Sequence, residues 1–405
     1  MSWKKVHIAD ICEIKSGKRI PKGFDFSPIT TDYRYIRARD IKKGKVDSSD
    51  LGYISKEVKD KIARYIVQED DVVVSIAGTI GEVGYVPSEL DGVNLTENAV
   101  RLTNFTEGVF SKFVLYWLMT EWSYEYMNGV AAGSAQPKLG IYKIEQIPIS
   151  LPSFEIQHRI ADILSAYDDL IENNRKQIKL LEEAAQRLYK EWFVDLRFPG
   201  YEHTKITDGV PEGWKIDLLS NIVKTTSGGT PARSHPEYYI NGSTLWVKTQ
   251  ELLDAFILDT EEKITDEAIT NSSTKLVSKG SILMAMYGAT IGKLGIASQD
   301  LTCNQACCVF DVSGFKYGGM YLFCWLFENR KFLIKLGKGV AQSNLSQTMI
   351  KNLNILIPDM NVLHQFSCIV DSLYSEILAN QKRITILSEA RDRLLPKLMS
   401  GEVEV

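Results

Sequence analysis

The cysteines are the first residues of this 405-residue chain to consider for chemistry, because clustered cysteines can bind a metal ion. Cys303, Cys307 and Cys308 lie close together, but they form no CxxC pair and have no histidine nearby, and a structural zinc site would need such ligands. The adjoining Val309 and Phe310 indicate an apolar strand instead. We therefore predict buried, reduced thiols at this point and no metal site in the chain.

Other groupings that enzymes use are also incomplete. Ser16, Gly17 and Lys18 resemble the end of a phosphate-binding loop, but the first glycine that such a loop requires falls at Cys12. The chain has no Asn/Asp-Pro-Pro-aromatic motif, which adenine methyltransferases use to grip an extruded base. Its five histidines are scattered: His7, His158, His203, His235 and His364. We predict that the chain has no catalytic residues and is not an enzyme by itself.

An ordered series of repeated motifs shows that the chain is two copies of one unit. Near the start of each copy the displacement is 211 residues, and later it falls to 206. The matched segments are 16–17 with 227–228, 35–37 with 246–248, 79–84 with 290–295, 135–139 with 341–345, and 149–152 with 355–358.

The first 150 or so residues of each copy contain short apolar runs separated by turn residues. Residues 71–76 and 281–287 are typical of buried strands, and residues 112–127 favour a helix. The repeated glycines at 78, 81, 288 and 292 suit tight turns. This pattern predicts an α+β domain whose loops offer recognition surface.

The last part of each copy is predicted to be a long helix with a heptad pattern, and Pro152 and Pro358 limit each helix at its start. Arg391 departs from the apolar pattern of the predicted seam. Two asparagines, Asn174 and Asn380, also interrupt it, and they occupy the same place in both copies. Buried asparagines can fix helix register. We favour antiparallel pairing that brings the two amides together; the alternative is that each faces water. The predicted seam positions are Ile160, Leu164, Tyr167, Ile171, Asn174, Ile178, Leu181, Ala185, Leu188 and Trp192, then Phe366, Val370, Leu373, Ile377, Asn380, Ile384, Leu387, Arg391, Leu394 and Leu398.

Positive charge is concentrated near the N-terminus although the net charge is −4. Residues 1–64 hold 16 Lys/Arg against 9 Asp/Glu. Arginine can pair with guanine, glutamine with adenine and lysine with phosphates, so the basic segment and its counterpart in the second copy are candidate DNA contacts. The alternative is a solvated strand edge or turn. The candidate DNA-binding residues are Lys18, Arg19, Arg37, Arg39, Lys42, Lys43, Gln136 and Lys138, and Thr230, Arg233, Lys248, Gln250, Gln342 and Asn344.

The whole chain resembles the specificity subunits of type I restriction–modification enzymes. Residues 187–200 and 393–402 resemble the ends of the two helices in those subunits. Residues 227–231, 288–292 and 340–345 resemble motifs of their target recognition domains. The resemblance implies an internally duplicated α+β protein with two target recognition domains separated by two long antiparallel coiled-coil helices. The implied boundaries are 1–152 for the first recognition domain, 153–195 for the central spacer helix, 196–358 for the second recognition domain and 359–405 for the C-terminal spacer helix.

The resemblance also implies partners and cofactors. Each domain would read one half of a split double-stranded DNA target, while the helices set the gap and dock two DNA methyltransferase subunits. Restriction–translocase subunits would join the complex. S-adenosylmethionine, ATP and Mg²⁺ are expected in those partners, and no cofactor is expected in this chain. Tyr189, Trp192 and Phe193 are candidates for methyltransferase docking or for core packing.

Two other functions stay open. One is a coiled-coil scaffold that binds proteins and has no DNA specificity; the other, a self-contained enzyme, is disfavoured by the missing motifs. No signal peptide or membrane-spanning run is apparent, so we expect a cytoplasmic protein without membrane contact.

Overall fold

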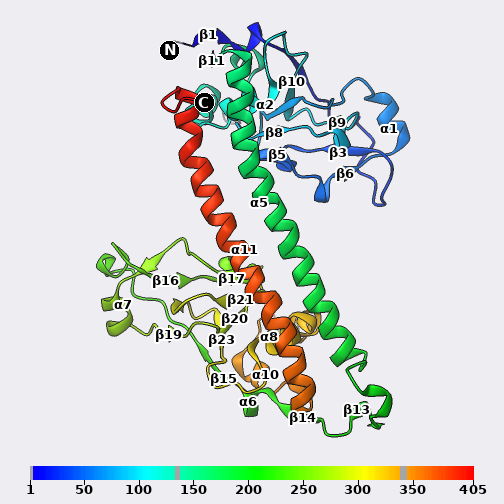
Figure 1. Cartoon of the computed structure of the whole chain (residues 1–405), viewed down its shortest axis with the longest axis vertical. Helices are drawn as coiled ribbons and strands as arrows, with labels where there is room; N and C mark the ends of the chain where they lie inside the picture. Colours follow the sequence, from blue (N-terminus) through cyan, green and yellow to red (C-terminus); the bar gives the residue numbers. More distant parts are fainter. Residues whose placement is uncertain (1–2, 133–136, 338–343) are drawn as a thin grey trace. The chain divides into compact units, whose positions relative to one another are not determined.

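The computed structural model describes residues 3–132, 137–337 and 344–405. It divides the chain into two compact units. Unit 1 contains Met1–Leu170 and Leu387–Val405, and unit 2 contains Ile171–Ile386. Each unit contains one copy of the repeated α+β domain and one segment from each of two long helices, which are continuous from one unit into the other (Figure 1).

Unit 1 contains a mixed six-stranded sheet in the order β2-β10-β7-β8-β5-β4, a three-stranded sheet β6-β3-β9 and the pair β1-β11. Its strands are β1 Lys4–His7, β2 Glu13–Ser16, β3 Arg34–Ile36, β4 Ile41–Lys42, β5 Gly44–Val46, β6 Gly52–Tyr53, β7 Val72–Ser75, β8 Val83–Tyr85, β9 Asn94–Leu95, β10 Ala99–Thr103 and β11 Pro148–Leu151. Its short helices are α1 Lys56–Lys61, α2 Ser111–Leu118, α3 Glu121–Ala131 and α4 Ile141–Glu145.

Unit 2 contains a five-stranded sheet in the order β15-β23-β20-β21-β17, a sheet β18-β16-β22-β19, and the pairs β14-β24 and β12-β13. Its strands are β12 Ile206–Thr207, β13 Val210–Pro211, β14 Lys215–Leu218, β15 Lys224–Ser227, β16 Thr244–Val247, β17 Ala255–Ile257, β18 Lys263–Ile264, β19 Leu276–Val277, β20 Ile282–Ala285, β21 Leu294–Ala297, β22 Leu301–Cys303, β23 Cys307–Asp311 and β24 Asn354–Ile357. Its short helices are α6 Leu219–Ile222, α7 Asp266–Asn271, α8 Gly319–Glu328, α9 Arg330–Gly337 and α10 Gln347–Lys351.

The two units repeat the same strand order. The sequence β2-β10-β7-β8-β5 in unit 1 corresponds to β15-β23-β20-β21-β17 in unit 2. The strand directions agree as well, because β5 pairs with β8 in parallel and β17 pairs with β21 in parallel. The internal duplication predicted from the sequence is therefore confirmed, and so is the α+β class.

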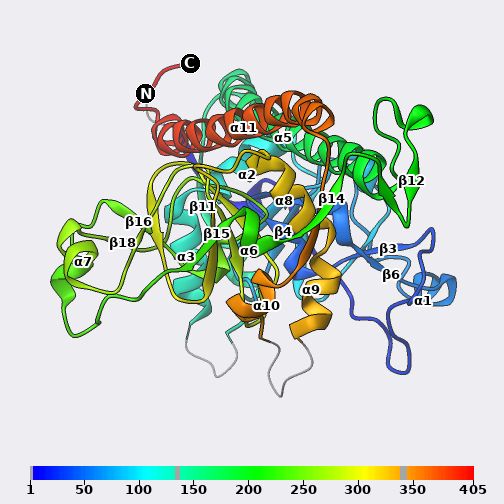
Figure 2. The ribbon, with the colours of Figure 1, turned by 90° about the horizontal axis from the view of Figure 1, so that it is seen from below.

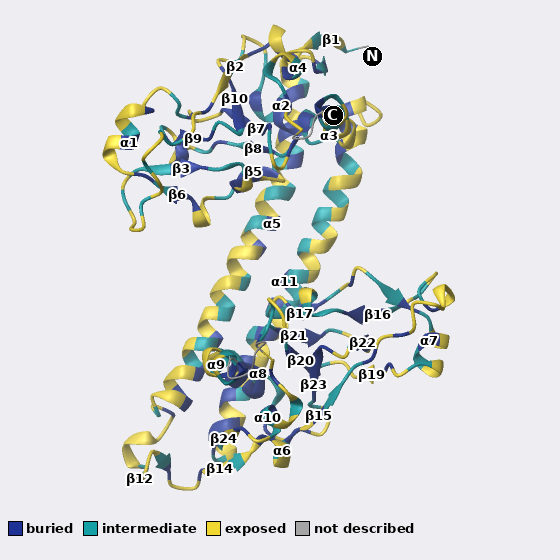
Figure 3. Ribbon diagram, turned by 180° about the vertical axis from the view of Figure 1, so that it is seen from behind, coloured by how far each residue is buried: buried dark blue, intermediate teal, exposed yellow. Residues whose placement is uncertain are grey.

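Local sequence explains where these elements form. The predicted strands at 71–76 and 281–287 are confirmed as β7 and β20, all of whose residues are buried. The predicted helix at 112–127 is instead two helices, because Thr120 accepts a hydrogen bond from the backbone of Ser123 and caps a new helix, α3, after α2 has ended. Cys307 and Cys308 lie in β23, and all three clustered cysteines are buried free thiols. Figure 3 shows the buried strands of both units in dark blue.

The two long helices are α5, Phe154–Tyr189, and α11, Met360–Ser400, and a π-helical turn at Lys190–Val194 follows α5. Within each unit the segments of α5 and α11 lie side by side and run in opposite directions (Figure 1). Every one of the predicted seam positions is buried or half-buried. The heptad pattern and the antiparallel pairing are therefore confirmed.

The two seam asparagines are buried, with exposed fractions of 8% for Asn174 and 0% for Asn380. Asn380 donates to Gln177 across the helix pair at 3.3 Å and accepts a hydrogen bond from Arg383 at 2.8 Å. Both contacts lie within unit 2. A role in setting the register, and the pairing of the two asparagine amides with each other, stay predictions.

The Arg391 side chain, which departs from the apolar seam, has a charged partner in unit 1. Arg391 donates to Asp168 on α5 at 2.6 Å, and the Tyr116 hydroxyl donates to the same carboxylate at 2.7 Å. Burial and the neighbouring Asp168 raise the pKa of Tyr116 far above its ordinary value. The residues displaced by 206 in unit 2 are Ala185 and Tyr374, and both are buried. One segment of the seam is therefore ionic and its counterpart is apolar.

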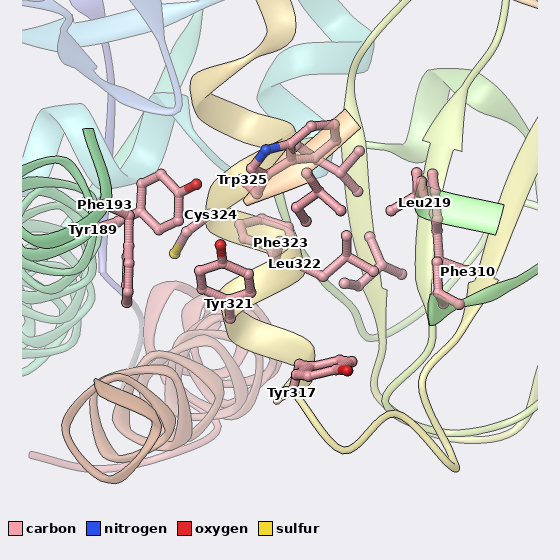
Figure 4. Packing of buried hydrophobic residues seen from close by; sticks show 14 of the residues in the cluster. Tyr189, Phe193, Leu219, Phe310, Tyr317, Tyr321, Leu322, Phe323, Cys324 and Trp325 are labelled. Carbon is pink, nitrogen blue, oxygen red and sulfur yellow. The ribbon is translucent and has the colours of Figure 1, made fainter. Parts of the chain in front are cut away.

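The side chains at the end of α5 belong to the core of unit 2. Tyr189, Trp192 and Phe193 are all buried, and the Phe193 ring centroid lies 4.9 Å from Tyr321 of α8 and 4.8 Å from Phe366 of α11. Figure 4 shows Tyr189 and Phe193 facing the side chains of α8. The suggestion that these three aromatic residues dock a methyltransferase is wrong, because the packing of their own unit covers them.

None of the helices in the described part of the chain has the length and apolarity that crossing a membrane requires. Within the same residues, no three His, Cys, Asp or Glu side chains are grouped closely enough to hold a metal ion.

The ion pair between the helices gives a stability prediction. Arg391→Ala leaves the largely buried Asp168 carboxylate without its cation, so we expect the free energy of unfolding to fall by about 2–4 kcal/mol. Arg393→Ala on the same helix is the control, because its ion pair with Glu389 is exposed and should contribute less than about 1 kcal/mol. Urea unfolding of the purified chain measures both. Equal stability of the two variants would contradict a structural role for the Arg391 pair.

Candidate nucleic-acid interface

Four of the predicted DNA-contact residues lie at a turn that both units repeat: Arg37, Arg39, Lys248 and Gln250. In unit 1, β3 leads into a 3₁₀ turn at Ala38–Asp40, and in unit 2, β16 leads into a 3₁₀ turn at Thr249–Glu251. The residue before each turn donates its backbone N–H to the acid that ends the turn. Arg37 donates to Asp40 at 2.8 Å, and Lys248 donates to Glu251 at 2.6 Å. The same local hydrogen bond therefore positions both candidates.

Ion pairs fix the Arg37 side chain at the first turn. Its guanidinium donates two hydrogen bonds of 2.9 Å to the buried Asp40 carboxylate, and it also donates to the backbone carbonyl of Asp50. The hydrogen bonds to Asp40 raise the pKa of Arg37. Arg39 is more exposed, and it donates to Asp50 at 3.1 Å. Arg37 therefore holds the turn together, whereas the guanidinium of Arg39 is accessible.

The side chain that precedes the second turn also lies among acids. Lys248 lies 2.6 Å from Glu261 and 3.2 Å from Glu262, and Gln250 donates to Glu261 at 3.1 Å. The hydrogen bonds with Glu261 raise the pKa of Lys248. The side chains of Lys248 and Gln250 thus share one carboxylate, which orients both of them.

Arg233 is held even more firmly, by charge and by aromatic rings. It makes two hydrogen bonds to Glu262, of 2.6 and 2.8 Å, and its guanidinium carbon lies 4.2 Å from the Tyr239 ring centroid and 5.4 Å from that of Trp246. The Arg233 hydrogen bonds lower the pKa of Glu262 to about 2. Arg233 is therefore a packed part of the surface, with roughly half of its side chain still accessible.

Two glycines let the candidate loops pass close to the neighbouring strand. A Cβ atom on Gly17 would lie 2.0 Å from the carbonyl oxygen of Thr96, and one on Gly228 would lie 1.9 Å from that of Cys303. Only glycine permits so close a backbone approach. The adjacent residues then hydrogen-bond to that strand, since Lys18 donates to Leu95 at 2.8 Å.

The side chains beyond these glycines differ between the units. In unit 1, the Lys18 ammonium lies 5.7 Å from the Tyr65 ring centroid, and the highly exposed Arg19 pairs with Glu97 at 2.6 Å. In unit 2, the Thr230 hydroxyl donates to Gln305. The same backbone loop therefore presents cations in one unit and neutral polar groups in the other.

Of the remaining candidates, Lys42 ends strand β4 and Lys43 lies in the turn that follows it. Lys42 pairs with Asp47 at 3.0 Å, and Lys43 adopts a left-handed conformation with φ 50°. Lys43, Lys138 and Asn344 are exposed. Gln136 and Gln342 lie outside the residues that the structure describes. The four turn glycines at 78, 81, 288 and 292 all have φ between 78° and 87°, which confirms their expected role.

Comparison with known proteins identifies the family of the chain. The family model described as type I restriction modification DNA specificity domain matches residues 1–183 and 211–388, one match in each copy. This chain belongs to that family. It is 30% identical to the MjaIX specificity subunit of Methanocaldococcus jannaschii over 364 residues, which cover 87% of this chain and 84% of the relative. It is 22% identical to the HindI specificity subunit of Haemophilus influenzae, over 99% of both chains.

The fold is also that of the specificity-subunit family. The crystal structure of the type I restriction–modification S subunit from M. genitalium is similar, with a TM-score of 0.61 and 17% identity. The similarity covers 98% of this chain and 96% of that one. Both recognition domains and both helices therefore have counterparts in a solved structure.

The acidic partners of Arg37 and Lys248 were not predicted from the sequence. Asp40 and Asp50 in unit 1 correspond at a displacement of 211 to Glu251 and Glu261 in unit 2. Both pairs lie beside the cation that precedes the turn. The repeated spacing of acids was a visible signal that these turns are ion-paired.

The close approach at Gly17 predicts a large effect of one methyl group. Gly17→Ala places a Cβ against a backbone carbonyl that cannot move aside, so we expect a loss of about 1–3 kcal/mol. Gly129→Ala is the matched control: the position lies inside α3, a Cβ there meets no atom within 4 Å, and alanine favours helix. Urea unfolding compares the two, and a Gly17→Ala chain as stable as wild type would contradict the tight backbone approach.

Proposed function

We propose that the chain reads a bipartite double-stranded DNA target, with one recognition domain for each half. The observation that carries this proposal is the repeated 3₁₀ turn, which presents Arg37 and Arg39 in unit 1 and Lys248 and Gln250 in unit 2 at corresponding positions. Because the backbones match and the side chains differ, the two domains suit different half-sites. Membership of the specificity family supports the same function.

The candidate contacts divide by how their side chains are held. Arg37, Lys248 and Arg233 are fixed by carboxylates, so they are oriented before DNA arrives and suit directional contacts to base edges. Lys43 and Lys138 are exposed and suit phosphates, which require charge more than direction. Lys18, Arg19, Lys42, Thr230 and Asn344 complete the proposed interface, with Gln136 and Gln342 outside the described residues.

The helix pair is proposed to set the gap between half-sites and to dock two methyltransferase subunits. Docking is supported by large apolar side chains that the chain leaves exposed on these helices: Leu180 on α5, and Ile369 and Ile386 on α11. Exposed apolar residues on a charged helix suit contact with another protein. S-adenosylmethionine would then be bound by the methyltransferase subunits, and ATP and Mg²⁺ by restriction–translocase subunits.

A methylation experiment tests the DNA-reading function. Genome-wide adenine methylation is mapped in a host that lacks this gene, and again with the gene restored beside its methyltransferase. We expect one split motif that depends on the chain. Replacing residues 1–152 with another recognition domain should change one half of the motif and leave the other unchanged. Methylation that does not depend on the chain would contradict the DNA-reading function and would favour the protein-scaffold function.

Salt dependence separates the two functions in vitro. A DNA reader loses affinity for duplex as salt rises, with a slope of about −0.9 for each phosphate contact. A scaffold that binds only proteins has no such slope, because it forms no duplex complex.

Partner docking has its own prediction. Leu180→Glu combined with Ile386→Glu introduces charge on the exposed apolar positions of the helices, and we expect co-purification with the methyltransferase to fall at least about tenfold, equivalent to 1.4 kcal/mol. The control is Ile240→Glu, an equally exposed residue elsewhere in unit 2. Undiminished co-purification of the double variant would place the docking surface on other residues.

A further inference from the structure

The sequence contains the pair Asn-Gly twice, as Asn128-Gly129 in unit 1 and as Asn241-Gly242 in unit 2. The side-chain amide of an asparagine can be attacked by the backbone nitrogen of the next residue. Glycine at that next position favours the attack, because it has no side chain to block the approach and its backbone rotates freely. Whether such a pair reacts in a folded protein therefore depends on how firmly the structure holds the two groups.

The first pair is held inside a helix. Asn128 and Gly129 lie in α3, and the Asn128 amide donates to the carbonyl of Tyr124 at 2.9 Å and to that of Ile80 at 3.2 Å. A helical backbone also directs the nitrogen of each residue toward the carbonyl four residues earlier and away from the side chain before it. The fold therefore protects this pair.

The second pair lies in an exposed turn between the 3₁₀ turn at Pro236–Tyr238 and β16. Asn241 is exposed and has a left-handed backbone, with φ 58°. Within the described residues its amide has no hydrogen-bond partner, and the Gly242 nitrogen donates to the Tyr239 carbonyl at a long 3.4 Å. A small local opening of the turn is therefore enough to bring the amide and the nitrogen together.

We propose that Asn241 is a site of spontaneous deamidation. The Gly242 nitrogen attacks the side-chain carbonyl carbon of Asn241 and forms a new C–N bond. The bond from that carbon to the amide nitrogen breaks, and ammonia leaves with the proton that the Gly242 nitrogen gave up. Water then opens the cyclic imide at one of its carbonyl carbons. One opening gives aspartate, and the other gives isoaspartate, in which the main chain runs through the side-chain carbons.

The turn has no room for the longer main chain of isoaspartate. A Cβ on Gly242 would lie 2.6 Å from backbone atoms of Lys263 and Ile264, so this part of the turn already touches β18. Two residues later, Thr244 of β16 pairs with Ile264 of β18, and Figure 2 shows both strands near α7. An extra carbon atom in the main chain at Asn241 therefore displaces the start of β16.

The same turn supports a proposed DNA contact. Tyr239, whose carbonyl accepts from Gly242, and Trp246 of β16 both hold the guanidinium of Arg233, with ring centroids 4.2 and 5.4 Å from its central carbon. Deamidation thus weakens the second recognition domain. The first is unaffected, because the equivalent residues at 30–31 are threonines. This consequence rests on the proposed DNA-reading function, whereas the chemical step does not.

Ageing the full chain in complex with its methyltransferase subunits tests the chemical step. The buffer is mildly alkaline, because base removes the proton from the attacking nitrogen. Peptide mass mapping should show that Asn241 is converted to acid while Asn128 stays an amide. In urea, which unfolds α3, both pairs should react. If the folded chain protects Asn241 as well as it protects Asn128, the proposed site is wrong.

Two variants connect the modification to DNA binding. Asn241→Gly removes the amide and suits the left-handed backbone, so its complex should keep its affinity for a duplex with the split motif after ageing. The aged wild-type complex should lose affinity by about tenfold, the scale of one lost base contact. Asn241→Asp carries the charge of the product without the longer main chain, and it should bind like fresh wild type.

The outcomes separate the inference from the function. Equal losses of affinity in the aged wild-type and Asn241→Gly complexes would contradict the effect of deamidation on the second domain. Absence of motif-dependent binding by the fresh wild-type complex would instead overturn the proposed DNA-reading function, and it would leave the mass-mapping result as it stands.

Discussion

The apolar seam of α5 and α11 is the constraint on which each unit depends, because it is part of the core of both. In unit 1, Ile160 and Leu164 of α5 and Leu398 of α11 join the cluster that contains β7, β10 and α2. In unit 2, Ala185 of α5 and Phe366 of α11 join the cluster that contains β20, β23 and α8. A recognition domain cut off from its helix segments would expose this surface to water, so each domain is built to be folded together with both helices.

The two units share the same backbone geometry at positions where the chain is tightly packed. Their side chains differ at positions where packing leaves room. Gly17 and Gly228 face a strand carbonyl at about the same distance, so neither position tolerates a Cβ. Two residues further along, Arg19 and Thr230 differ, and both side chains are exposed. The repeated 3₁₀ turns behave in the same way, since the acid that accepts the backbone N–H is kept while the residue before the turn changes from arginine to lysine. Specificity can therefore diverge between the domains at little cost in stability.

The helix seam is also not a simple repeat. Arg391 pairs with Asp168 in unit 1, while the corresponding residues of unit 2, Ala185 and Tyr374, form an apolar contact surface. A charge placed against the apolar counterpart would be buried without a partner, which is strongly unfavourable. The arrangement therefore favours the observed alignment of the helices over a shifted one, and buried Asn380 adds a polar group that needs its partner Gln177.

Several features of this protein were determined by its sequence alone. Motifs repeated at displacements of 211 and 206 established the duplication, and the heptad spacing established the helices and their seam, because both are periodic patterns along the chain. The resemblance of residues 187–200 and 393–402 to specificity subunits gave the family. The tertiary structure decided which candidate side chains are held and which are available. Arg233 meets Glu262 and Trp246 only when distant parts of the chain come together. Phe193 is likewise covered by Trp214, Tyr321 and Phe366, which are distant from it in the sequence. Burial and ion pairing between residues far apart in the chain leave no local pattern, so only the folded chain could reveal them.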